Sequence, residues 1–392
     1  MTASKTNISS NRDIKIAISV FISGLSCFGL LYYYQALLPD LAIHFRINKA
    51  ESSLAVSSST LGMAFGLITA MFVADRYSRK RVIGYSLLIA SFFALTSSFS
   101  GSFTWLTVFN FFKGFFLAGS TSVCLAYVSE EVSVSKKLKI TGFYISGNAI
   151  GGMVGRVSAA HFTQKYSWET ASELLGGICL VLALLFFFVA PKSNNFQPKK
   201  QSFKTLIKPN LLVIFNRKLF PYYLTGFLLL GAFVSLYNYM AFFLVKEPFN
   251  ISKEWIPYVY FLYIAGIAGS MSVSFWQKKL QSSSQILKAM SLLGSLGIAL
   301  LFLKTELLVI LGVAIFTYAF FVAHTVCSKS IGEFYHSKKS VTIAVYLLCY
   351  YLGASILGSS TGLLLGSLGW IIFLFAIIFI FLSIFFIFIN NF

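Results

Sequence analysis

Residues 16–38 read IAISVFISGLSCFGLLYYYQALL, a run of 23 residues without a charged side chain. A transmembrane helix needs about 20 mostly apolar residues, so this run is long enough to cross a bilayer. Eleven similar stretches follow, at 53–74, 82–100, 104–128, 139–162, 168–190, 221–244, 257–276, 286–303, 306–328, 341–364 and 368–389. With 57% hydrophobic residues and a mean hydropathy of +0.80, the sequence excludes a soluble protein and predicts an all-α integral membrane fold with twelve transmembrane helices.

The charged residues predict the orientation of these helices. The chain has 31 Lys and Arg residues against 12 Asp and Glu residues, a formal net charge of +19. Most of the cations fall in loops on one side of the predicted helices, as at 76–81, 136–139 and 192–218, and such loops stay in the cytoplasm. We therefore expect both termini in the cytoplasm and contacts between the basic loops and membrane lipids. Because the cations form no single basic face, we expect no nucleic-acid partner.

The longest hydrophilic interval between predicted helices divides the chain into two halves. It predicts an N-terminal six-helix bundle over 1–190, a cytoplasmic connector over 191–220 and a C-terminal six-helix bundle over 221–392. The fifth helix of each half carries glycines four residues apart, at Gly147, Gly151 and Gly155 and at Gly358, Gly362 and Gly366. Glycines at this spacing line one helix face and let a neighbouring backbone approach closely. We therefore expect two pseudo-symmetric bundles, the plan of a 6+6 secondary transporter.

The loop after the second predicted helix carries a family signature. It reads DRYSRKR over 75–81 and resembles the G-x-x-x-D-R-x-G-R-R/K motif of the major facilitator superfamily, with Met71 and Ser78 in place of the two glycines. In that family the loop holds the two bundles together in the outward-facing state of the transport cycle. The resemblance implies a conformational gate in which Arg76 or Arg79 pairs with an acid at the end of the fourth helix. Its members would be Asp75, Arg76, Arg79, Glu130 and Glu131.

Further segments narrow this resemblance to the YnfM-like branch of bacterial efflux carriers. They include AYVSEE over 126–131, YISGN over 144–148 and YNY over 237–239, in the same order along the chain. The resemblance implies a secondary active transporter in a bacterial inner membrane. It would export a small molecule by alternating access, as a proton-coupled antiporter, and we expect it to be a monomer. We expect no cofactor, and the four histidines show no metal-ligand spacing.

Three ionisable side chains fall deep within predicted helices, where a charge is costly, and each is therefore a candidate functional residue. Lys113 lies near the middle of the fourth helix, Arg156 in the outer third of the fifth and His324 in the tenth. No Asp or Glu falls clearly in the middle of a predicted helix. Two buried cations without a buried acid favour an anionic substrate, such as a carboxylate or phosphate-bearing metabolite or a carboxylate siderophore.

Each of these three residues also has a purely structural interpretation. Lys113 can bond to Asn110, one turn away on the same helix, which stands where the family has an arginine. Arg156 can extend its side chain towards the membrane surface or bond to a helix end. His324 either couples transport to protons, since imidazole titrates near neutral pH, or serves packing alone.

Uncharged polar side chains complete the predicted substrate site. Amide groups buried in hydrocarbon need hydrogen-bond partners, so Asn148 and Asn238 are the strongest candidates. The full predicted set of substrate-binding residues is Lys113, Asn110, Arg156, Asn148, Tyr144, Gln35, Asn238, Tyr237 and Tyr350.

Three alternative functions stay open at this point. The same fold could serve a drug or sugar efflux carrier, or an importer. Outside the transporter class, the alternative is an integral membrane enzyme that modifies lipids. Such an enzyme needs acidic and histidine residues clustered at one membrane face, whereas the 12 acids here are scattered along the chain, so we expect no enzyme.

Overall fold

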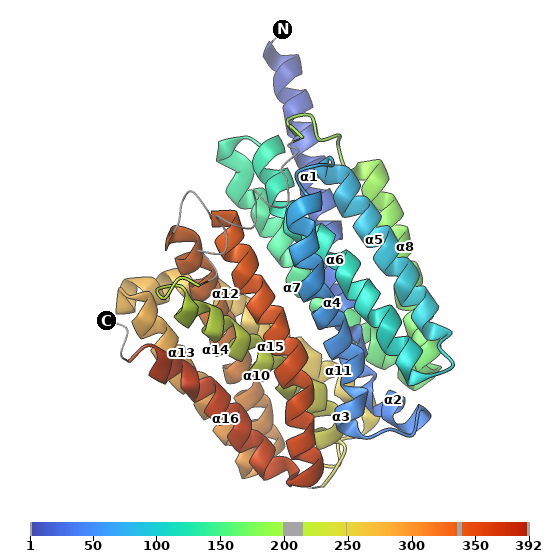
Figure 1. The fold of residues 1–392 in the computed structure, drawn as a ribbon, viewed down its shortest axis with the longest axis vertical. Helices are drawn as coiled ribbons and strands as arrows, with labels where there is room; N and C mark the ends of the chain where they lie inside the picture. The colour runs from blue at the N-terminus through green and yellow to red at the C-terminus, as the bar shows by residue number, and fades with distance from the viewer. Residues whose placement is uncertain (1, 199–214, 248, 335–338, 390–392) are drawn as a thin grey trace. The chain divides into compact units, whose positions relative to one another are not determined.

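The computed structural model describes residues 2–198, 215–247, 249–334 and 339–389. Within these ranges the chain is almost entirely helical and contains no β-strand (Figure 1). Helices are favoured because hydrocarbon offers no partner to backbone N–H and C=O groups, which must then bond within their own segment. Each of the twelve predicted stretches lies in a helical segment, so the predicted all-α membrane fold is confirmed.

The twelve stretches correspond to long helices joined by short helical turns. The long helices are α1 (Thr2–Tyr32), α4 (Leu54–Val73), α5 (Arg79–Ser98), α6 (Phe103–Glu131), α7 (Val134–Lys165), α8 (Trp168–Val189), α10 (Phe220–Leu244), α12 (Tyr263–Leu280), α13 (Ser283–Leu300), α14 (Glu306–Phe334), α15 (Lys339–Ser367) and α16 (Gly369–Ile387). The short segments are η1 (Tyr33–Ala36), α2 (Leu38–His44), α3 (Lys49–Ser52), η2 (Lys253–Trp255), α11 (Ile256–Val259), η3 (Tyr260–Leu262) and η4 (Leu301–Leu303).

Helix α7 differs from the other long helices in composition. Eleven helices of the described chain are long and apolar enough to cross a membrane, and α7 is not among them although it has 32 residues. Its glycines and its polar residues Asn148, Arg156 and His161 lower its hydropathy. Because α7 packs along α1, this less apolar helix has a protein neighbour to cover its glycine face.

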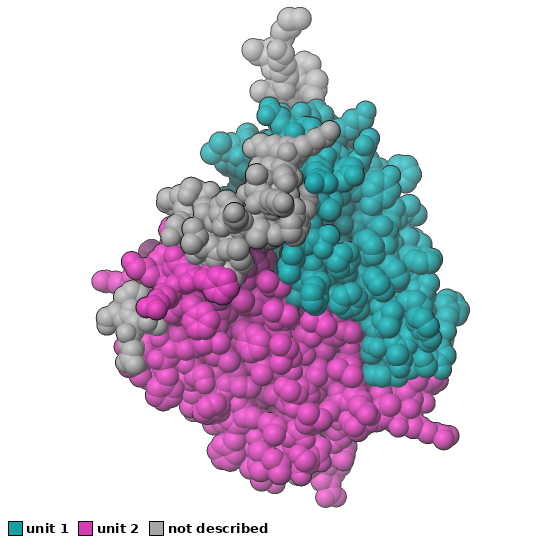
Figure 2. Space-filling view, viewed as in Figure 1, with its two compact units in different colours: residues 1–34, 62–203 teal, residues 35–61, 204–392 magenta. Residues whose placement is uncertain are grey.

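The chain divides into two compact units (Figure 2). Unit 1 contains Met1–Tyr34 and Gly62–Phe203, and unit 2 contains Gln35–Leu61 and Lys204–Phe392. In unit 1, α1 packs mainly on α7, and α5 packs on α6 and α8. In unit 2, α10 packs mainly on α15, and α13 packs on α14 and α16. The first, third, fourth, fifth and sixth long helices thus have the same neighbours as their counterparts six helices later, as a structural repeat requires.

The two compact units do not follow the predicted domain boundaries at residues 35–61. The predicted N-terminal bundle, 1–190, includes them, whereas their contacts group them with unit 2. There α3 packs against α15, and the Ser355 hydroxyl donates a hydrogen bond of 2.9 Å to the Ser57 carbonyl oxygen. The predicted connector, 191–220, includes residues 199–214, which lie outside the described residues, so the three-part division stays a prediction.

The glycine triplet of α7 sets the distance between α7 and α1. A Cβ atom on Gly147 would lie 2.5 Å from the carbonyl oxygen of Phe21, and one on Gly155 would lie 2.7 Å from that of Gly29. A Cβ atom on Gly151, between them, would overlap the Leu25 carbonyl oxygen. The three glycines therefore meet three α1 carbonyl groups spaced by four residues, and the close backbone approach predicted for α7 is confirmed.

In the second triplet, in α15, the predicted backbone approach is found at Gly362 alone, where a Cβ atom would lie 3.0 Å from the Ala50 Cα atom. A Cβ atom on Gly358 would meet the side chain of Val234, one on Gly362 would overlap the Tyr239 ring, and one on Gly366 would meet nothing within 4 Å. The close backbone approach between α10 and α15 instead lies one turn earlier, where a Cβ atom on Gly353 would overlap the Phe227 carbonyl group. In α15 the glycines make room for side chains because α10 presents a large tyrosine at this level.

The packing of α7 on α1 predicts the effect of a single added methyl group. Gly151→Ala places a Cβ atom against the backbone of Leu25, and overpacking of this kind destabilises a folded state by about 1–3 kcal/mol. We expect a lower melting temperature for the purified protein in detergent. Gly142→Ala is the matched control, because Gly142 lies in the same helix, is exposed and has open space where a Cβ atom would be. Equal melting temperatures for the two variants would contradict this account of the α1–α7 contact.

Candidate functional site

Lys113 is buried in the interior of unit 1, where α6 meets the end of α1. Its side chain is fully buried, and its Nζ atom donates a hydrogen bond of 2.6 Å to Asn110 Oδ1, one turn earlier in α6. The Nζ atom also lies 4.5 Å from the ring centroid of Tyr33 and 4.6 Å from that of Tyr34. Two aromatic faces and one amide oxygen therefore surround the ammonium group, and such cation–π contacts strengthen when the cation is removed from water.

Both tyrosines that contact Lys113 lie in the 3-10 turn η1, which directly follows α1. The chain leaves the α-helical conformation at Tyr33, and the two rings lie with their centroids 4.3 Å apart. The sequence showed the tyrosine cluster without indicating which rings would contact a cation.

Two buried polar atoms beside Lys113 have no hydrogen-bond partner among the described residues. They are Asn110 Nδ2 and the hydroxyl oxygen of Tyr33, and both side chains are fully buried. The Tyr34 hydroxyl, in contrast, lies 2.9 Å from Ser97 Oγ and 3.4 Å from Ser172 Oγ. No carboxylate of the described chain forms an ion pair with Lys113. The site thus combines a cation with two unsatisfied donor groups, and each unsatisfied buried group costs about 1–3 kcal/mol.

Arg156 has a different environment within the same unit. Its side chain is 1% exposed, and its guanidinium carbon lies 4.7 Å from the ring centroid of Tyr32. Its Nη1 atom donates a hydrogen bond to the carbonyl oxygen of Gly152, one turn earlier in α7. The glycine at 152 leaves room for this path, since a Cβ atom there would lie 3.2 Å from Arg156 Nη1. The side chain thus follows its own helix and stacks on Tyr32.

Tyr144 and Asn148 lie one turn apart in α7, at the level of Gly24 in α1. Tyr144 is buried and Asn148 is half-buried. A Cβ atom on Gly24 would overlap Asn148 Oδ1, so the amide faces α1 directly. Asn148 Oδ1 has no hydrogen-bond partner among the described residues, so this amide can accept a further hydrogen bond.

A second group of predicted residues forms a hydrogen-bond chain in unit 2. Gln35 Nε2 donates to Asn238 Oδ1 over 2.9 Å, and Asn238 Nδ2 donates to the Gly358 carbonyl oxygen over 3.1 Å. All of Gln35, Asn238 and Tyr237 are fully buried. The Tyr237 hydroxyl lies 2.8 Å from Thr317 Oγ1 in α14. Gln35 and Asn238 were predicted separately, and the structure brings them into direct contact.

His324 lies in an aromatic cluster of unit 2. Its Nδ1 atom lies 2.8 Å from the Tyr346 hydroxyl, and its ring stacks on Tyr350 with centroids 4.5 Å apart. Phe320, one turn earlier in α14, is nearly parallel to the imidazole at an interplanar angle of 6°. The predicted residues His324 and Tyr350 are therefore in contact, and the Tyr346 hydroxyl is a hydrogen-bond partner of the imidazole.

The charged residues predicted to form a gate divide into two ion-pair groups in unit 1. Arg79 Nη2 lies 2.7 Å from Glu130 Oε1 and 3.4 Å from Asp75 Oδ1, while Arg79 Nε donates to both Glu130 oxygens over 3.1 Å. Arg76 is exposed. Of the two arginines considered, Arg79 therefore makes the predicted pair. Its role as a gate stays a prediction.

Glu131 has partners that the sequence did not suggest. Arg12, in α1, forms an ion pair with Glu131, whose side chain is fully buried. The backbone N–H of Asn195 donates to Glu131 Oε1 over 2.8 Å, and the Asn195 side chain donates to the Glu130 carbonyl oxygen over 2.9 Å. Arg12 lies 119 positions before Glu131, so no local spacing could have indicated this pair.

The departure from the family signature at Ser78 causes no backbone conflict. Ser78 precedes α5 and has a φ of −59°, which any residue adopts. A glycine at this position is therefore not needed for a left-handed conformation.

The Arg79–Glu130 pair predicts a measurable coupling energy. In a double-mutant cycle of Arg79→Ala and Glu130→Ala, the two effects on the free energy of unfolding should be non-additive by about 0.5–3 kcal/mol, as for residues in direct contact. The matched cycle replaces Arg79→Ala with Arg76→Ala, because Arg76 is an exposed cation of the same loop. Additive effects in the Arg79 cycle, or equal coupling in the two cycles, would show that this ion pair does not stabilise the fold.

Comparison with known proteins agrees with this architecture. The family profile described as Major Facilitator Superfamily matches residues 16–358. The chain is 33% identical over 363 residues to the inner membrane transport protein YnfM of Escherichia coli K12, covering 91% of this chain and 85% of that protein. It is 32% identical over 358 residues to the uncharacterized MFS-type transporter YybF of Bacillus subtilis 168, covering 91% and 88%. The structure of a D323A mutant of the nucleoside transporter NupG matches with a TM-score of 0.77 at 16% identity, covering 97% and 99%.

Proposed function

Because this chain belongs to the major facilitator superfamily of membrane transporters, we propose that it exports a small anionic metabolite in exchange for protons. The observation that carries this proposal is the buried Lys113 with its unsatisfied neighbours. The substrate class that fits best is a carboxylate, of which carboxylate siderophores are one example. The family membership excludes the lipid-modifying enzyme considered from the sequence.

The chemistry of the Lys113 site matches a carboxylate. An ionised carboxylate presents two oxygens and about four acceptor positions, and it has no donor of its own. Lys113 Nζ, Asn110 Nδ2 and the Tyr33 hydroxyl are donor groups, and the latter two have no partner among the described residues. A bound carboxylate would neutralise the ammonium charge and accept from both free donors. An organic cation at the same place would instead be repelled and would leave the donors unsatisfied.

Access to Lys113 requires movement, because the side chain is fully buried in this conformation. The break in helical geometry at η1 carries Tyr33 and Tyr34, and a shift of this turn relative to α6 would uncover the ammonium group. Alternating access in transporters of this architecture is achieved by rocking of helical repeats around a site near the middle of the membrane. In this proposal, Arg156, Tyr144 and Asn148 extend the site along α7.

The remaining predicted residues have proposed roles in unit 2 and in the loops. The hydrogen bond from Gln35 to Asn238 holds the start of the segment 35–61 against α10, so it would have to break if that segment moved away from α10. His324 is the candidate for proton coupling, with Tyr346 as its hydrogen-bond partner and Tyr350 stacked on its ring, while Tyr237 and Tyr350 would contribute to substrate binding. Asp75, Arg76, Arg79, Glu130 and Glu131 would form the gate. We further propose that the transporter is a monomer of a bacterial inner membrane with both termini in the cytoplasm.

The experiment first identifies the substrate and then measures its transport. Metabolites inside and outside the cells are profiled in a deletion strain, and in strains restored with the wild type or Lys113→Gln. An anionic metabolite should accumulate inside the deletion strain and leave only when the wild type is restored. Its uptake into inside-out membrane vesicles should then fall at least about tenfold in Lys113→Gln, because a hydrogen bond to a charged group contributes about 1.5–3 kcal/mol.

Lys165→Gln is the matched control, since Lys165 is an exposed cation at the end of α7. It should transport like the wild type. A neutral or cationic substrate that is unaffected by Lys113→Gln would exclude the anion proposal and favour a drug or sugar carrier. A compound left unused in the medium of the deletion strain would show an importer instead.

A further inference from the structure

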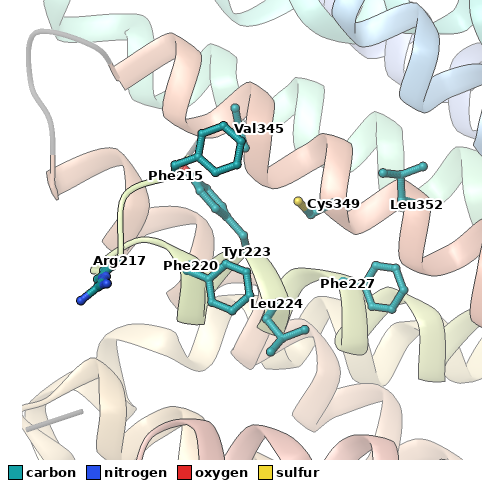
Figure 3. A pocket seen from close by; sticks show the side chains of 9 residues that line it. All are labelled: Phe215, Arg217, Phe220, Tyr223, Leu224, Phe227, Val345, Cys349 and Leu352. Carbon is teal, nitrogen blue, oxygen red and sulfur yellow. The ribbon is translucent and has the colours of Figure 1, made fainter. Parts of the chain in front are cut away.

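A groove on unit 2 lies between the first two turns of α10 and the first half of α15, away from the residues discussed above. It encloses about 460 Å³. Its lining is almost entirely aliphatic and aromatic, with one charged residue: Phe215, Arg217, Phe220, Tyr223, Leu224, Phe227, Val345, Cys349 and Leu352. In Figure 3, Arg217 lies at one end of this row of side chains, and Phe227 and Leu352 lie at the other.

The position of the groove along α10 places its charged end near a membrane surface. Arg217 and Lys218 are exposed and directly precede α10, which begins at Phe220. Phe215 and Phe220 are 79% and 59% exposed, as is usual for aromatic side chains at the interface between headgroups and hydrocarbon. From there the lining continues along α10 to Phe227, into the part of the helix that is apolar throughout. One end of the groove is therefore cationic and at the surface, and the other is in hydrocarbon.

The groove is unsuited to a polar substrate. Substrate sites combine an apolar wall with several convergent polar groups, whereas Arg217 is the only charged residue in this lining. Phe227, at its inner end, precedes Asn238 by 11 positions in the same helix, a separation of about 16 Å along the helix axis. The groove is therefore a separate feature from the hydrogen-bond chain of Gln35 and Asn238.

We propose that this groove binds an anionic phospholipid. One acyl chain lies along Tyr223, Leu224, Phe227, Val345 and Leu352, and the phosphate group pairs with Arg217 at the surface. The charge and the hydrocarbon of such a lipid are arranged in the same order as the cation and the apolar wall of the groove. The guanidinium group is suited to this role because its planar donors match the geometry of phosphate oxygens. This site is independent of the substrate proposed above.

The test uses the full-length protein in lipid nanodiscs. The discs contain a phosphatidylglycerol with a photoactivatable diazirine in one acyl chain, or the phosphatidylcholine analogue, and labelled peptides are mapped by mass spectrometry. We expect phosphatidylglycerol to label 215–227 and 345–352 more than phosphatidylcholine does. Arg217→Gln should lower labelling by phosphatidylglycerol about fivefold, the contribution of one cation near an anionic surface. Lys218→Gln is the matched control, because this neighbouring exposed cation is not part of the lining.

A second variant tests the apolar part of the groove. Leu352→Trp fills the end farthest from Arg217 and should lower labelling by both lipids, while the protein still elutes as a single species in detergent. Three results would overturn the proposal: equal labelling by the two lipids, labelling unchanged in Arg217→Gln, or no labelling of the groove in the wild type. The last would mean that another part of the chain or another ligand occupies the groove.

Discussion

Hydrocarbon offers no hydrogen-bond partners, so a polar group inside either unit is costly unless it finds its partners within the protein. Several buried hydroxyl groups bond to a carbonyl oxygen one turn earlier, as Ser91 does to Leu87 and Thr225 to Pro221. A few bond across helices, as Ser235 does to the Leu357 carbonyl oxygen. Lys113 is the extreme case, because a basic side chain is fully buried with one amide oxygen and two ring faces around its amino group. The functional interpretation of this protein depends on that environment.

The two units meet the same packing requirement in different ways. In unit 1, the glycines of α7 bring its backbone against α1, which leaves little room for side chains between the two helices. Between α10 and α15 in unit 2, such a contact forms at Gly353, while Gly358 and Gly362 make room for Val234 and Tyr239. The Tyr239 hydroxyl donates to the Gly358 carbonyl oxygen over 3.1 Å, as does Asn238. The same pair of helices in the repeat thus forms a tightly packed backbone contact in unit 1 (α1 with α7) and a contact with polar side chains in unit 2 (α10 with α15).

The sequence alone was enough to predict where the long helices lie and which ionisable residues are buried. The length of each hydrophobic run located all twelve helical stretches, because charged residues are costly in lipid and therefore fall mostly outside such runs. It did not reveal the 3-10 turn at Tyr33–Ala36, which contains the two tyrosines that surround Lys113. Long-range pairs such as Arg12 with Glu131, or Gln35 with Asn238, could not be predicted either, since nothing in local spacing relates them. The glycine spacing in α15 matches that in α7, but only Gly362 of that triplet meets a neighbouring backbone.

The central claim is that Lys113, fully buried in this conformation, becomes accessible from water and binds the substrate during transport. The most direct measurement is the reaction of Lys113→Cys, in a variant without native cysteines, with a water-soluble anionic thiol reagent in membranes. We expect the cysteine at 113 to react. Leu117→Cys, equally buried one turn further along α6, should stay unreactive. If the two positions are equally unreactive under all conditions, Lys113 is part of a closed packing core and the account of an anion site is wrong.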